Sequence, residues 1–249
     1  FMHRACRAFI VGACLALAAC GTTVQTSSYP PIEPKKSALA IDLQQRSWWQ
    51  LRFKLNWPTD ESPDFSAHLL LAEQILLPVI LEHEQQLPLW RFHRRAARTP
   101  AGHQFSLIFL ADKETADQLG RDVSENALTV WLQEASMLEK TSLDRRGLED
   151  LAEIEETSDR EWPQAIQRSW PWFIMGASQS WLMQVQQISE EKGLSESMEY
   201  AILLKHYRDV ALSMNNQWRD FGQHAYFHHL SALYGYQPLK VRTTELRQF

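Results

Sequence analysis

Alternating apolar and polar side chains mark several stretches of the chain. In SWWQLRFKLNW (residues 47–57), large apolar side chains occupy every second position, and mostly polar side chains fill the positions between them. Such alternation predicts a strand with one buried face. The pattern recurs in LWRFHRRAA (89–97) and HQFSLIFLA (103–111), and ALTVWLQ (127–133) predicts a fourth strand.

Helical spacing of apolar residues separates these strands. One helix is expected from Asp64 or Ser66 to about residue 86, with Pro78 expected to kink or divide it. Asp112 is expected to cap a second helix that runs to about residue 123. The order β-α-β-β-α-β predicts an α+β fold with a ferredoxin-like sheet. In that arrangement the second strand lies beside the third, and the third beside the first.

The C-terminal half predicts helices. Residues 142–161 are rich in carboxylates, and a helix is expected to begin at Ser169 or Trp170, followed by Pro171. Apolar spacing of three and four residues then continues from residue 195 to the region before Gly235. We therefore expect a ferredoxin-like domain at residues 45–140 and a helical subdomain at 141–249, packed on the sheet.

The N-terminus has the pattern of a secretory signal, with a short basic region followed by an apolar stretch at residues 8–19. That stretch is too short for a membrane-spanning helix, which needs about 20 residues. LALAAC, which ends at Cys20, resembles the lipobox of bacterial lipoproteins. The resemblance implies a signal peptide at residues 1–19, a lipidated Cys20, and a flexible tether at 20–44. Gly21 implies sorting to the outer membrane, with the protein facing the periplasm.

Charge and cysteine content limit the classes of partner and the kinds of chemistry that the sequence predicts. The chain of 249 residues has 25 basic and 30 acidic residues, and removal of Arg4 and Arg7 with the signal leaves 23 against 30, a net charge of −7. An acidic chain does not favour nucleic acid as a partner, nor direct adhesion to anionic lipid. All three cysteines lie in the first 20 residues. The predicted mature domain therefore has no disulfide, and its membrane contact is the lipid anchor.

Basic side chains should gather on one face of the predicted sheet, flanking Gln104 and Ser106. These candidates are Arg52, Lys54, Arg91, His93 and Arg95. Such a group suits a carboxylate or phosphate ligand. Two alternatives stay open: the cations protect a sheet edge from aggregation, or the acidic residues 149–161 fold over them.

Two further patterns, a histidine pair and an aromatic stretch, do not predict a functional site. His224 and His228 have the i, i+4 spacing that zinc sites use, but no nearby carboxylate motif supplies a third ligand. Aromatic residues between Trp170 and Met183 suit a packed core better than a ligand groove. We predict no catalytic residue, no metal site and no cofactor.

Three stretches together resemble the thiopeptide-type bacteriocin biosynthesis domain, a module related to the C-terminal part of lantibiotic dehydratases. They are WWQLRFKL, LWRFHRRAARTPAGHQFSLIF and FHHLSALYG. The resemblance spans about residues 47–236 and makes His103, which begins the histidine-led strand, a further candidate. The arginines that follow the histidine in the family are replaced by Phe105 and Leu107, and its asparagine–arginine pair by Ser231 and Ala232. The resemblance therefore implies a shared scaffold rather than a shared activity.

The sequence thus predicts a non-enzymatic, lipid-anchored periplasmic module that binds a partner protein or an anionic envelope component. One alternative is a retargeted elimination enzyme, with a polar pocket that contains His103 and the cluster at residues 224–229. A second alternative is a hydrophobic-ligand carrier with a cavity near residues 170–183.

Overall fold

The computed structural model describes residues 43, 45–146, 153–194 and 199–239, all within a compact unit that starts at Ile41. The predicted signal peptide, Cys20 and nearly all of the predicted tether lie outside the described residues. Within the described part, no helix has the length and apolar character needed to cross a membrane.

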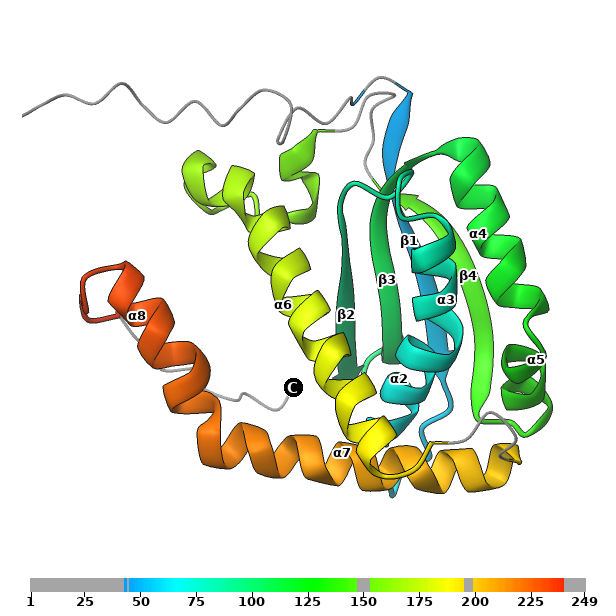
Figure 1. The fold of residues 1–249 in the computed structure, drawn as a ribbon. Helices are drawn as coiled ribbons and strands as arrows, with labels where there is room; N and C mark the ends of the chain where they lie inside the picture. The colour runs from blue at the N-terminus through cyan, green and yellow to red at the C-terminus, as the bar shows by residue number, and fades with distance from the viewer. Residues whose placement is uncertain (1–42, 44, 147–152, 195–198, 240–249) are drawn as a thin grey trace, which may run out of the picture. The chain divides into compact units, whose positions relative to one another are not determined.

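A four-stranded antiparallel sheet forms the centre of the described chain (Figure 1). Its strands are β1 (Arg46–Leu55), β2 (Trp90–Ala97), β3 (Gly102–Asp112) and β4 (Leu138–Arg146), in the order β2-β3-β1-β4. The expected neighbours are confirmed, because β3 lies between β2 and β1. With its helices, the structure belongs to the α+β class.

The helical segments fall into three groups along the chain. Between β1 and β2 come α2 (Ser66–Leu70), the π-helix η1 (Leu71–Leu76) and α3 (Leu77–Glu82). Between β3 and β4 come α4 (Lys113–Glu125) and α5 (Ala127–Glu134). After β4 come the 3₁₀-helix η2 (Ile154–Thr157), α6 (Gln164–Glu191), α7 (Tyr200–Gly222), the π-helix η3 (Gln223–His228) and α8 (His229–Leu233).

The prediction of a strand at residues 127–133 is wrong, because this stretch forms helix α5. The side chain of Asn126 caps the helix by accepting a hydrogen bond from the Leu128 N–H at 2.9 Å. Leu128 and Leu132, four residues apart, are both buried on one side of the helix. The fourth strand is β4 instead, and the domain boundary expected at residues 140/141 falls inside it.

Two prolines show how helices accommodate a missing N–H. Pro78, expected to kink or divide its helix, occupies the first turn of α3, directly after the π-helical turn η1, which ends at Leu76; the backbone stays helical throughout. The expected start at Ser169 or Trp170 is wrong. Helix α6 begins at Gln164 after Pro163, so Pro171 lies inside the helix and only interrupts its hydrogen bonding.

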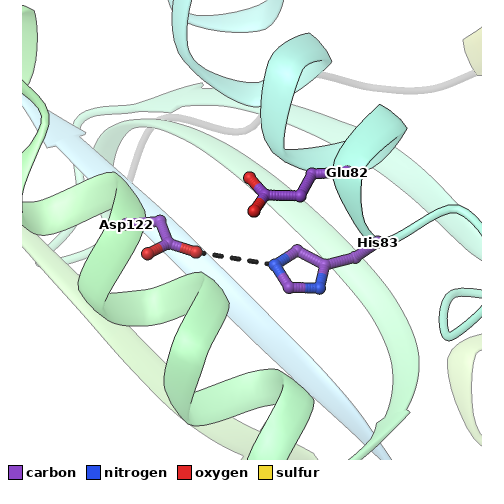
Figure 2. A group of neighbouring side chains, drawn as sticks. All are labelled: Glu82, His83 and Asp122. Carbon is purple, nitrogen blue, oxygen red and sulfur yellow. Dashed lines mark hydrogen bonds and ion pairs between the residues drawn. The ribbon is translucent and has the colours of Figure 1, made fainter.

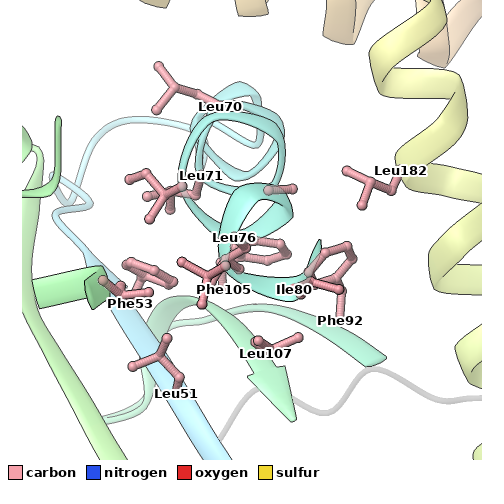
Figure 3. Close-up of a cluster of buried hydrophobic side chains, with 14 of the residues drawn as sticks. Leu51, Phe53, Leu70, Leu71, Leu76, Ile80, Phe92, Phe105, Leu107 and Leu182 are labelled. Atoms are coloured by element: carbon pink, nitrogen blue, oxygen red, sulfur yellow. The ribbon is translucent and has the colours of Figure 1, made fainter. Parts of the chain in front are cut away.

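The main core lies between one face of the sheet and the helices that cover it (Figure 3). Leu51, Phe53, Phe105 and Leu107 point from the sheet toward apolar side chains of α2, η1, α3 and α6. On the opposite sheet face a smaller cluster contains Trp48, Leu89, Ile108 and Leu110, packed against Ile154, Trp172 and Met175. This cluster covers one end of that face, and polar side chains occupy the other end.

Candidate functional site

The polar end of the second sheet face contains most of the predicted basic residues. Strand pairing arranges them in two rows across β2, β3 and β1. The rows are His93–Ser106–Arg52 and Arg95–Gln104–Lys54. Adjacent strands lie about 4.8 Å apart, so the polar side chains of each row are within reach of one small ligand.

Strand β4 adds two cations to this face that are not among the predicted candidates, and only Lys140 continues one of the two rows. Lys140 pairs directly with Lys54, and Arg146 pairs with Trp48. The available signal was the alternation of Lys140, Ser142, Asp144 and Arg146 along the strand. With the fourth strand predicted at residues 127–133, these positions have no place in the predicted sheet.

These side chains line a concavity of about 520 Å³ on the sheet. Its lining includes five cations, the imidazole of His93 and the amides of Gln50 and Gln104. The five cations are Arg52, Lys54, Arg95, Lys140 and Arg146. We call this feature the basic concavity.

Carboxylates neutralise only part of the basic concavity. Arg52 pairs with Asp144 at 3.1 Å, and Lys54 pairs with Glu139 at 2.7 Å. Within the described residues the other three cations, Arg95, Lys140 and Arg146, have no carboxylate partner. The concavity therefore keeps an excess of positive charge.

Two pKa values reflect that charge. Burial lowers the pKa of His93, and the positive charges of Arg91, Arg146 and Arg95 lower it further. Burial, followed by the charge of Arg52, lowers the pKa of Arg146. The lowered pKa values mean that positive charge on these two side chains is disfavoured. A bound anion would raise both pKa values again.

Arg91 lies at the covered end of the same face and does not line the concavity. Its Nη2 donates to the carbonyl of Thr157 at 3.3 Å, and burial followed by the charge of Arg146 lowers its pKa to about 10. Nearby, the indole of Trp48 donates to the carbonyl of Glu153 at 2.8 Å. The described part of the acidic segment, from residue 153 onward, thus covers the Arg91 end of the face and does not line the concavity.

His103 is not part of the basic concavity, contrary to its grouping with the basic residues. It alternates in phase with Phe105, so its side chain faces the main core and is 2% exposed. Its ring lies 4.6 Å from that of His68 and 5.2 Å from that of Phe65. An aromatic cluster, rather than an open polar pocket, surrounds it.

The C-terminal histidines lie on η3 and α8. The rings of His224 and His228 stack with centroids 5.4 Å apart, and His229 lies 5.5 Å from each. All three residues are exposed. In the described part of the chain, these three side chains do not bring their donor atoms together as a ligand group.

Comparison with known proteins gives little support for any function. No protein-family model matches this chain, and no curated protein is significantly similar to it. Among solved structures, the chain is similar to a dimeric ferredoxin-like protein of unknown function from Thermobifida fusca YX, with 15% identity and a TM-score of 0.29. That match covers 43% of this chain and 96% of the other. A TM-score this low does not establish a shared fold.

Proposed function

We propose that this protein is a lipid-anchored, non-enzymatic binding module of the periplasm. It uses the basic concavity to bind an anionic group of a partner protein or of an envelope component. The observation that carries this proposal is one concavity with three cations that have no carboxylate partner among the described residues. The anchor at Cys20 and the outer-membrane location rest on the lipobox resemblance.

The expected architecture supports the same proposal. We take the part from β1 to β4 as a ferredoxin-like domain, because its strands and helical segments follow the β-α-β-β-α-β order. The helices from α6 onward form a C-terminal subdomain, and Ser178 of α6 accepts a hydrogen bond from the edge strand β2. Helices thus cover one face and one edge of the sheet, and the concavity opens on the other face.

The chemistry of the concavity favours a compact anion. Arginine binds carboxylate and phosphate groups with two parallel hydrogen bonds, and Arg95 and Arg146 are available for such contacts. Gln50 and Gln104 add amide groups that can orient the ligand. The proposed ligand class is therefore a phosphate or carboxylate group displayed by an envelope molecule or by an acidic protein segment.

The alternatives receive less support. A retargeted elimination enzyme would need an open polar pocket at His103, where the structure has packed aromatic rings. A hydrophobic-ligand carrier would need an apolar cavity near residues 170–183. In that stretch Phe173 and Met183 are exposed on the surface of α6.

A charge-matched pair of variants tests the proposal. Arg95→Gln with Arg146→Gln removes two of the cations that line the concavity, and Lys205→Gln with Arg219→Gln removes two exposed cations from α7. A hydrogen bond to a charged group contributes about 1.5–3 kcal/mol, so the first pair should weaken binding at least tenfold. The second pair should change it less than twofold.

Calorimetric titration with pyrophosphate and pull-down from detergent-solubilised membranes provide the two measurements. The first pair of substitutions should reduce both pyrophosphate affinity and the recovery of co-purifying envelope material. Equal losses in the two pairs would show that only overall charge matters and would contradict the proposed site.

A further inference from the structure

Three potential metal ligands converge where helix α3 ends beside helix α4 (Figure 2). Glu82 is the last residue of α3, His83 follows as its C-cap, and Asp122 lies on α4. Each offers one donor atom, and the three atoms lie within 4.8 Å of one another. In the described part of the chain, this is the one group of three such side chains that meets this condition.

The distance between the two central donors fits a shared cation better than a direct hydrogen bond. His83 Nε2 and Asp122 Oδ2 are 3.5 Å apart, which is long for a hydrogen bond between an imidazole and a carboxylate. In a tetrahedral zinc site, with bonds of about 2.0–2.2 Å, neighbouring ligand atoms are separated by about 3.4 Å. These two donors therefore already have the required separation.

Hydrogen bonds outside the group hold the Asp122 carboxylate in place. Gln118 Nε2 donates to Asp122 Oδ1 at 2.7 Å, and Arg121 donates to Gln118 Oε1 at 2.6 Å. Because arginine only donates, its contact fixes which end of the Gln118 amide faces Asp122. The hydrogen bond from Gln118 occupies Oδ1 and leaves Oδ2 directed at His83. Outer hydrogen-bond partners orient metal ligands in the same way.

We propose that Glu82, His83 and Asp122 bind a divalent cation of the Zn²⁺ class. One imidazole and two carboxylates form a donor set that zinc accepts, whereas Mg²⁺ and Ca²⁺ prefer oxygen ligands alone. Water would complete the coordination, since Glu82 is exposed and the side chains of His83 and Asp122 are 14% and 29% exposed. The cation would tie the end of α3 to α4, two helices that cover the main core.

The sequence predicted no metal site because its only histidine pair with zinc spacing lies at residues 224 and 228. The proposed ligands instead come from helices that precede β2 and follow β3 in the sequence, and His83 and Asp122 are 39 positions apart. Such a group has no local spacing pattern. Only the packing of α3 against α4 brings the donors together.

Isothermal titration of the full chain with zinc chloride tests the site. Cys6, Cys14 and Cys20 are first changed to Ser, since thiolates bind zinc themselves. In that background His83→Ala and Asp122→Asn should each weaken the tightest zinc binding at least tenfold. Gln118→Ala, which removes only the outer hydrogen bond, should weaken it about tenfold.

Two controls separate this site from other sources of binding. His224→Ala with His228→Ala removes the exposed histidine pair and should leave the tightest zinc binding unchanged. Titration with magnesium chloride should give no comparable binding. Glu82→Gln, at an exposed position, serves as a third ligand variant if either of the others fails to fold by circular dichroism. Unchanged zinc affinity in the folded ligand variants, or a loss confined to the His224 and His228 variant, would overturn the proposal.

Discussion

His68 shows how one hydrogen bond sets the position of the proton on an imidazole ring. Arg94 Nε donates to His68 Nδ1 at 3.1 Å. Because arginine cannot accept, Nδ1 must be the acceptor, and the proton of the neutral ring is on Nε2. Burial, followed by the charges of Arg94 and His103, holds the pKa of His68 well below its usual 6.5.

Acid sensitivity near pH 6 follows from the burial of several histidines. Burial is the main cause of lowered pKa values at His68, His93, His103 and His206. The unfolded chain therefore binds protons near pH 6.5 that the folded chain does not. Stability from these residues is fully present above pH 6.5 and is lost as the pH falls through the lowered pKa values.

We expect the free energy of unfolding to decrease by up to about 1.4 kcal/mol per pH unit for each such histidine. Urea unfolding between pH 7.5 and 5.5 measures the slope, and His68→Gln should make it shallower. Glu73 has the opposite effect on the free energy of unfolding. Burial raises the pKa of its carboxyl group, so its contribution stabilises the folded state as the pH falls toward 4.5. An unchanged slope in His68→Gln would contradict the assignment to His68.

At the scale of elements, alternation found the strands that have one deeply buried face. Three of the four strands were predicted close to their observed bounds, since β1 and β3 carry apolar side chains at every second position. Strand β4 was missed because Leu138 is its one fully buried residue. At residues 127–133 the alternating and helical patterns coincide, and the Asn126 cap favours the helix.

The same reasoning explains which site residues could be predicted. Arg52, Lys54, His93 and Arg95 followed from alternation within strands that were correctly placed. Lys140 and Arg146 required β4. The phase of His103 with Phe105 predicts that it lies on the core face of the sheet, whereas the family resemblance concerns only the identity of the residue.

Edge strand β2 depends on one hydroxyl of α6. Ser178 Oγ accepts from the Phe92 N–H at 3.1 Å and donates to the Ile174 carbonyl at 2.8 Å. Ser178→Ala would leave a buried N–H without a partner, so we expect a loss of about 1–3 kcal/mol in urea unfolding. Ser169→Ala is the matched control, because its exposed hydroxyl bonds only to carbonyls of α6.

Substitution of Ser169 should change stability by no more than about 0.5 kcal/mol. If Ser178→Ala proves equally mild, then α6 does not protect this edge through its hydroxyl. Other contacts, such as the packing of Trp181 against Phe92 with ring centroids 5.6 Å apart, would then hold the helix.

At the scale of the whole molecule, the sign of the basic concavity opposes that of the chain. The net charge is −5, yet one sheet face gathers three cations that no carboxylate of the described segments neutralises. An anionic ligand is therefore attracted only locally, and this attraction weakens as salt screens it. Such a charge distribution suits a protein that must select an anionic group without adhering to every anionic surface.

The proposed anchor and the proposed site make separate contributions to this function, and Cys20→Ser distinguishes them. Without its thiol the chain cannot be acylated at residue 20, so we expect it to move from the membrane fraction to the soluble periplasmic fraction. Its affinity for pyrophosphate should stay unchanged, because the concavity is formed by residues between Gln50 and Arg146. Mass spectrometry and membrane fractionation measure the first effect, and calorimetry the second. If the variant remained in the membrane fraction, another contact would have to hold the protein there, whereas a loss of pyrophosphate binding would mean that the concavity depends on the anchor.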